Sequence, residues 1–267
     1  MQRLGQHFLK NNSAIKKIIS SLELRSGETV IEIGPGHGEL TFPLAKICGQ
    51  IGCNLVAIEK DEKLAYQLES IASRENIKNL KIIKGDARRL LSSVAEGIVE
   101  DNYKLVGNIP YYITGLLFRL VGNLKKRPVL CVFTIQKEVG ERLVAESPHM
   151  NRLAAIVQFW GEPRIVAGLP KENFTPKPKV DSAIVKIVTR DELPNDKLQN
   201  IYERAVKSLF AQPRKTIINN IYENNNQKSI PKEKVVVELE KIGIDPKSRP
   251  QDLSIEDIMK IATTIFS

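Results

Sequence analysis

Residues 28–190 alternate short β-branched runs with longer stretches of helical periodicity, and this alternation constrains the fold more than any other feature. Runs typical of strands occupy residues 28–34, 54–60, 80–86, 103–108 and 129–135. Strands separated by helices predict a mostly parallel sheet with helices on both faces. Two later runs, 163–169 and 182–188, have no helix between them. We expect them to form a terminal antiparallel pair that brings the sheet to seven strands.

The pattern changes near residue 191, where the segment DELPND ends the last strand run. Beyond it every periodic segment is helical, and one more helix is expected over residues 11–24, ahead of the sheet. A chain of 267 residues has room for one large domain and one small one. We therefore predict an α/β domain over residues 1–190 and a small all-α domain over residues 191–267.

The net charge of +9 comes from the first domain. Residues 1–190 carry 28 basic and 19 acidic side chains, whereas residues 191–267 carry 12 of each. A positive field of this kind favours a polyanionic partner. Charge alone does not exclude the alternative that the basic surface only keeps the protein soluble. The three cysteines lack metal-ligand spacing, so we expect reduced thiols in a cytoplasmic protein. We also expect no membrane span and no secretory signal.

A glycine-rich turn follows the first strand run, where Ile33 leads into Gly34, Gly36 and Gly38. Glycines allow a ligand to approach the backbone closely. The spacing is GxGxG rather than the dinucleotide fingerprint GxGxxG, and Glu39 stands where that fingerprint has its third glycine. The turn therefore suits a nucleoside ligand without phosphates, and a purely structural strand–helix connection remains the alternative.

Carboxylates end the next two strand runs. Glu59 is placed to accept the two hydroxyls of a ribose, and Asp86 to accept the exocyclic amine of an adenine. Each could instead cap the following helix. Because ligands of open α/β sheets bind at the carboxyl ends of the strands, three suitable strand ends in succession favour the ligand interpretation.

The fourth strand run ends in the turn Asn108-Ile109-Pro110-Tyr111. The Asn108 side-chain oxygen and the Ile109 carbonyl can both accept hydrogen bonds from an exocyclic amine, and Pro110 stiffens the turn. The Tyr111 ring offers a stacking surface for a base. The turn is therefore suited to hold a planar amine against an electrophilic carbon; a buried aromatic turn is the alternative.

These segments together resemble the motifs of S-adenosylmethionine-dependent methyltransferases that act on adenine N6 of ribosomal RNA. More narrowly, the chain resembles the bacterial dimethyladenosine transferase family of the small-subunit RNA. The matching segments are IEIGPGHG (31–38), AIEKD (57–61), KGDA (84–87) and GNIPYY (107–112), with residues 3–9, 136–139, 173–183, 214–216 and 249–254. His7 and Tyr112 depart from the family, in which many members have Asn, and Pro213 stands where a basic residue is common.

The resemblance implies a Rossmann-like methyltransferase domain followed by a helical RNA-recognition domain. It implies N6,N6-dimethylation of two adjacent adenosines in the 3′-terminal hairpin loop of 16S rRNA, late in small-subunit biogenesis. S-adenosylmethionine is the implied methyl donor, without a metal, and the implied partner is a small ribosomal subunit or its precursor. We expect a cytoplasmic monomer.

The resemblance also implies a cofactor-binding or catalytic role for each residue that matches a family motif. The implied cofactor-binding residues are Gln6, His7, Leu9, Gly34, Gly36, Glu59, Lys60, Asp86, Ala87 and Asn108. The implied catalytic residues are Asn108, Ile109, Pro110, Tyr111 and Phe174, with Tyr111 and Phe174 stacking on the target adenine. Candidate RNA contacts are the basic residues Arg88, Arg89, Lys125, Lys126, Arg127, Arg204, Lys207, Arg214 and Lys215.

Three other functions stay open. A large-subunit (23S) rRNA adenine methyltransferase of the macrolide-resistance type shares the turn at 107–111. A non-catalytic ribosome-assembly or transcription factor could use the same fold, although the intact Glu59, Asp86, Asn108 and Tyr111 argue for catalysis. A NAD-dependent oxidoreductase is disfavoured by Glu39 and by the Asn–x–Pro–Tyr turn.

Overall fold

The computed structural model describes residues 7–100, 102–192, 195–224 and 231–267. They form two compact units, one of Met1–Glu141 with Glu162–Thr189 and one of Arg142–Gly161 with Arg190–Ser267. Among the described residues, no helix is both long and apolar enough to cross a bilayer. Cys48, Cys53 and Cys131 are buried free thiols.

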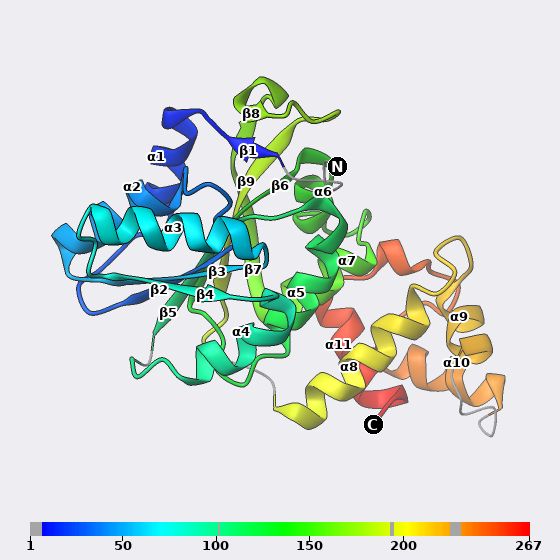
Figure 1. Ribbon diagram of the computed structural model, residues 1–267. Helices are drawn as coiled ribbons and strands as arrows, with labels where there is room; N and C mark the ends of the chain where they lie inside the picture. Colours follow the sequence, from blue (N-terminus) through cyan, green and yellow to red (C-terminus); the bar gives the residue numbers. More distant parts are fainter. Residues whose placement is uncertain (1–6, 101, 193–194, 225–230) are drawn as a thin grey trace. The chain divides into compact units, whose positions relative to one another are not determined.

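The first unit is built on a seven-stranded sheet of order β4-β3-β2-β5-β6-β9-β7 (Figure 1). Strands β2 to β6 pair in parallel, and β9 runs antiparallel to β6. The mostly parallel seven-stranded prediction is confirmed, with the antiparallel β9 lying between β6 and the edge strand β7. The strands are β2 (Thr29–Ile33), β3 (Asn54–Glu59), β4 (Leu80–Lys84), β5 (Tyr103–Asn108), β6 (Leu130–Gln136), β7 (Gly161–Leu169) and β9 (Ser182–Thr189).

Helices cover both faces of this sheet, with α1, α2 and α3 on one side and α4 and α5 on the other (Figure 1). Their bounds are α1 (Asn12–Ser21), α2 (Thr41–Ile51), α3 (Glu62–Arg74), α4 (Ala87–Glu96), α5 (Thr114–Gly122) and α6 (Lys137–Leu143). Asn11, Asp61 and Asp86 begin α1, α3 and α4 by accepting a backbone N–H from the first helical turn, which satisfies donors that a helix leaves unpaired.

A two-stranded sheet joins the start of the chain to its late motif. Strand β1 (Phe8–Leu9) pairs antiparallel with β8 (Phe174–Thr175), with Leu9 opposite Phe174. Lys10 N–H donates to the Asn173 carbonyl at 2.8 Å, and Asn11 Nδ2 donates to Asn173 Oδ1 at 3.0 Å. The N-terminal segment is thus fastened to residues more than 160 positions later.

The second unit is helical. It contains α7 (Arg152–Trp160), α8 (Asp196–Leu209), α9 (Ile217–Asn224), α10 (Lys232–Lys241) and α11 (Ile255–Ile265). Residues 142–161 were expected in the first domain, but Ala154, Ala155 and Phe159 of α7 belong to the core of this unit. The Phe159 ring stacks on Tyr202 of α8 with centroids 3.9 Å apart. The boundary near residue 190 is therefore the last of three points at which the chain passes from one unit to the other.

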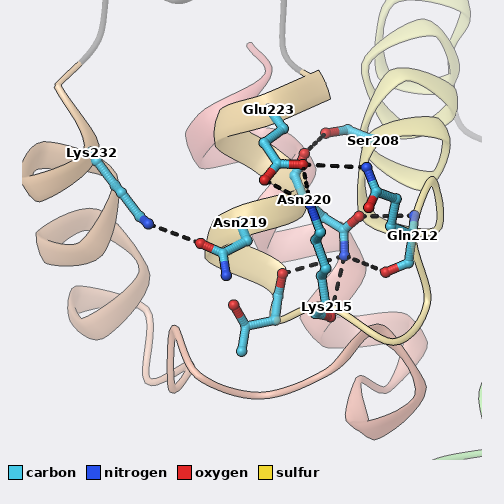
Figure 2. A network of polar contacts seen from close by, with 8 residues as sticks. Ser208, Gln212, Lys215, Asn219, Asn220, Glu223 and Lys232 are labelled. Carbon is cyan, nitrogen blue, oxygen red and sulfur yellow. Dashed lines mark hydrogen bonds and ion pairs between the residues drawn. The ribbon is translucent and has the colours of Figure 1, made fainter.

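A buried asparagine organises the connection between α8 and α9 (Figure 2). Asn220 is fully buried, and its Oδ1 accepts the Gln212 N–H at 2.9 Å. Its Nδ2 donates to three carbonyls, those of Gln212, Lys215 and Thr216, at 3.0 to 3.3 Å. Lys215 Nζ pairs with Glu223 at 2.7 Å. One side chain thus holds both ends of the 212–216 loop.

We expect Asn220→Ala to lower the free energy of unfolding by about 2–4 kcal/mol, because it leaves several buried backbone groups unpaired. The matched control is Asn219→Ala, whose amide oxygen accepts only Lys232 Nζ among the described contacts (Figure 2). Urea unfolding of both variants measures the difference, and equal losses would show that Asn220 has no special role.

Candidate active site

One cavity lies at the carboxyl ends of β2, β3, β4 and β5. Most of the side chains and turns singled out in the sequence line it together, namely His7, Gly34, Gly36, Glu59, Lys60, Asp86, Ala87, Asn108, Ile109, Pro110 and Tyr111. The sequence did not single out Phe8, Ile33, Ile58, Gly85, Ile113 or Leu117, which line it as well. They are apolar residues or a glycine beside the motifs, and only the fold brings them to the cavity.

The glycine turn needs its glycines for two different reasons. Gly34 and Gly36 have φ values of +69° and +62°, in the left-handed region that favours glycine,. A Cβ on Gly36 would come within 2.8 Å of the Phe8 ring, whereas a Cβ on Gly34 would meet no atom within 4 Å. Gly36 is therefore held against the N-terminal segment, and Gly34 leaves open space beside the cavity.

Glu59 ties the turn to the next strand. Its side chain is buried, and Oε2 accepts the Gly36 N–H at 3.0 Å while Oε1 accepts the Asp61 N–H at 2.8 Å. Each carboxylate oxygen can accept a second hydrogen bond. The carboxylate is thus fixed by backbone donors and keeps capacity for the hydroxyls of a sugar.

Asp86 caps α4 and is also paired with two cations. Its Oδ1 accepts the Arg88 N–H at 3.0 Å, Arg88 Nε lies 3.0 and 3.1 Å from its two oxygens, and Lys60 Nζ lies 3.1 Å from Oδ2. The Arg88 guanidinium holds the pKa of this carboxyl well below its usual range. An adenine amine must share the carboxylate with Arg88 or displace that side chain.

Asn108 is oriented by the N-terminal segment. Its Nδ2 donates to the His7 carbonyl at 2.6 Å, so Oδ1 is the acceptor that the side chain retains for another group. The His7 Nδ1 is 2.7 Å from the Pro176 carbonyl, which requires a proton on that nitrogen. His7 thus links the 108–111 turn to the residues that follow β8.

Tyr111 is held as a wall of the cavity. Its hydroxyl lies 3.0 Å from Ser182 Oγ, and its ring centroid lies 5.7 Å from that of His7. Burial raises the pKa of the phenol above its ordinary value, so the hydroxyl keeps its proton at neutral pH. The short helix η1 (Tyr111–Ile113) begins at this residue.

Two assigned residues, Leu9 and Phe174, do not line the cavity, and the placement of a third is not described. Gln6 lies outside the described residues. Leu9 and Phe174 face each other across the β1–β8 pair, are 4 % and 3 % exposed, and belong to the hydrophobic core of the first unit. Among the described residues, no group of three or more His, Cys, Asp or Glu side chains could hold a metal ion.

Glu32 is a buried acid that the sequence interpretation passed over. It lies on β2, two residues before the glycine turn, and is 2 % exposed. Desolvation raises its pKa to about 8, and the charges of Glu59 and Glu39 add to the rise. Among the described residues, its Oε2 is buried without a hydrogen-bond partner. The sequence signal that could have identified Glu32 is its position as the acidic residue inside an otherwise largely apolar strand run.

We expect Glu32 to make the protein less stable as the pH rises. Between its ordinary pKa of 4.5 and its folded pKa of about 8, the folded state binds a proton that the unfolded state has lost. Stability therefore falls across this window, by a few kcal/mol at most. Urea unfolding at pH 5, 6.5 and 8 should give a flatter profile for Glu32→Gln than for the parent. The exposed Glu62→Gln is the control, and a slope unchanged by Glu32→Gln would contradict the assignment.

A family model and curated relatives match nearly the whole chain. The family model described as ribosomal RNA adenine dimethylase matches residues 1–266. A Dehalococcoides mccartyi protein, ribosomal RNA small subunit methyltransferase A, is 35 % identical over 97 % of this chain and 86 % of its own length.

Two solved structures share the fold. A dimethyladenosine transferase from Plasmodium falciparum has a TM-score of 0.78 and 25 % identity, covering 96 % of each chain. The 23S rRNA methyltransferase ErmE has a TM-score of 0.73 and 24 % identity, covering 97 % of this chain and all of its own.

Proposed function

The chain belongs to the ribosomal RNA adenine dimethylase family, and from that premise we propose that it dimethylates N6 of two adjacent adenosines in the 3′-terminal hairpin loop of 16S rRNA. The chain is a methyltransferase that uses S-adenosylmethionine to methylate ribosomal RNA. The observation that carries the finer proposal is that the Asn108–Tyr111 turn lines the same cavity as Glu59 and Asp86. A methyl donor and an acceptor amine can therefore occupy one site.

The residues present fit S-adenosylmethionine. Glu59 is a buried carboxylate with remaining acceptor capacity for the ribose, Asp86 stands at the next strand end for the adenine, and Gly34 leaves space for the methionine part. Lys60 and Ala87 flank these carboxylates in the same cavity wall. When bound, the cofactor supplies an electrophilic methyl group on a sulfonium.

The role of the turn is to make N6 of the adenine a better nucleophile. The amine is weak because its lone pair is delocalised into the ring. Accepting its N–H groups on Asn108 Oδ1 and the Ile109 carbonyl favours a tetrahedral nitrogen whose lone pair is available. Pro110 stiffens the turn, the Tyr111 ring stacks on the base, and alignment supplies much of the rate. The target base must leave its own stack to enter such a site.

In this structure Phe174 does not reach the cavity, because its side chain is buried opposite Leu9. A direct stack of Phe174 on the target base requires β8 to shift toward the cavity. His7 lines the cavity and is proposed to close the cofactor site together with Gln6, while Leu9 supports this segment from the hydrophobic core.

Several candidate RNA contacts already have partners inside the protein. Arg88 pairs with Asp86 and Lys215 with Glu223, while Lys126, Arg127 and Arg204 donate to backbone carbonyls. The exposed cations Arg89, Lys125, Lys207 and Arg214 are therefore the proposed phosphate contacts. We propose that a monomer binds a small subunit or its precursor through them.

The test uses small subunits from a strain that lacks the modification. The protein and methyl-labelled S-adenosylmethionine are added, and modified positions are mapped by mass spectrometry of RNA fragments. Two methyl groups on each of two neighbouring adenosines near the 3′ end support the proposal. Label on large-subunit RNA alone would assign the chain to the macrolide-resistance type. Cofactor binding without label on either RNA would indicate an assembly role.

A further inference from the structure

Tyr112 lines the cavity and presents an exposed apolar ledge there. Tyr112 belongs to η1 and is 71 % exposed. Tyr112 lines the same cavity as Asn108 and Tyr111. The function proposed above uses Tyr111 and leaves this neighbouring ring without a role.

The two adjacent tyrosines are held very differently. Tyr111 is half-buried and its hydroxyl is bonded to Ser182, so its ring is fixed inside the cavity. Tyr112 is 71 % exposed, and its hydroxyl interacts with the charge of Arg88 without fixing the ring inside the cavity. A large aromatic surface beside a nucleotide site is what single-stranded bases stack on.

We propose that the Tyr112 ring stacks on the nucleotide that flanks the target adenosine. The inference rests on the proposed function. When one of two neighbouring adenosines enters the cavity, the other loses a stacking partner, which is part of the cost of base flipping. The Tyr112 ring replaces that stacking partner and so lowers the free-energy cost of extruding the target base.

The charge at this corner suits a nucleic-acid backbone. Lys60 and Arg88 both pair with one carboxylate, that of Asp86, and their side chains are 59 % and 38 % exposed. The group therefore keeps a net positive charge beside the ledge. Lys60 and Arg88 keep their pairing with Asp86 and attract the phosphate that follows the stacked base through their net charge rather than by direct contact.

The experiment measures KM and kcat on small subunits that lack the modification, for Tyr112→Ala, Tyr112→Phe and Tyr112→Trp. Loss of one base stack predicts a KM for subunits raised about 5- to 150-fold in Tyr112→Ala. Tyr112→Phe and Tyr112→Trp should stay within about threefold of the parent, because they keep the ring. The dissociation constant for S-adenosylmethionine should not change in any of them. The matched control is Tyr66→Ala, an exposed tyrosine on α3 that does not line the cavity.

A second substrate tests which base is held. Subunits are assembled with an abasic nucleotide in place of the flanking adenosine. The parent protein should then lose as much as Tyr112→Ala loses on intact subunits, and the two losses should not add.

Four results would overturn the inference. They are an unchanged KM in Tyr112→Ala, an equal loss in Tyr112→Phe, weaker cofactor binding in Tyr112→Ala, and additive losses on the abasic substrate. A parent protein that binds the cofactor yet methylates no subunit would instead reject the proposed function itself.

Discussion

Asn108→Ala is expected to lower kcat for rRNA methylation by about 10²- to 10³-fold, the loss typical of removing one hydrogen-bonding group that acts on the reacting atoms. The alanine cannot accept the amine N–H, so N6 keeps its lone pair in the ring. The cofactor site is built mainly by other strand ends, and S-adenosylmethionine should bind within about tenfold of the parent affinity, a limit set at one hydrogen bond. Single-turnover transfer to small subunits and cofactor calorimetry measure the two effects.

Asn108→Asp separates the two functions of this side chain. It keeps an acceptor oxygen but cannot donate to the His7 carbonyl, the bond that orients Asn108 at 2.6 Å. We expect a rate between those of the parent and of Asn108→Ala. A rate for Asn108→Ala close to that of the parent would remove the turn from the mechanism.

Glu59→Ala is expected to weaken S-adenosylmethionine binding by about 10²- to 10⁴-fold, because two hydrogen bonds to a charged group are lost, each worth about 1.5–3 kcal/mol. The substitution also removes the acceptor of the Gly36 N–H, so the turn loses its anchor to β3. Calorimetry with S-adenosylhomocysteine measures the affinity, and thermal unfolding measures the loosened turn.

Two variants make the Glu59 result specific. Glu59→Gln keeps the shape and one acceptor and should fall between parent and alanine. Glu62→Gln changes an exposed acid in the first turn of α3 and should bind normally. Cofactor affinity in Glu59→Ala equal to that of the Glu62→Gln control would refute the ribose assignment.

The sheet and the strand-end site were predictable because parallel strands leave two independent marks. They are buried on both faces, so they read as apolar runs such as 29–33 and 103–107,. Their carboxyl ends meet at one edge, so polar residues that follow successive runs must converge. Gly34, Glu59, Asp86 and Asn108 follow from these two marks alone, and the cavity brings them together.

What the sequence could not indicate depends on which surfaces pack together. From its sequence pattern, the apolar face of α7 could pack against the core of either unit. Only the packing of Phe159 on Tyr202 assigns it to the helical unit. Phe174 shows no sign in the sequence of being buried against Leu9. The Arg88–Asp86 pair depends on a rotamer, and residue spacing does not fix rotamers.

The β1–β8 pair has a consequence for the order in which the protein becomes functional during synthesis. His7 and Phe8 are synthesised about 170 residues before their partners, Thr175 and Pro176. Ser182, which holds Tyr111, emerges later still. A nascent chain shorter than this has its glycine turn and its carboxylates but neither a fastened N-terminal segment nor a fixed stacking ring. The enzyme therefore cannot complete its active site until the segment that carries β8 and Ser182 has been translated.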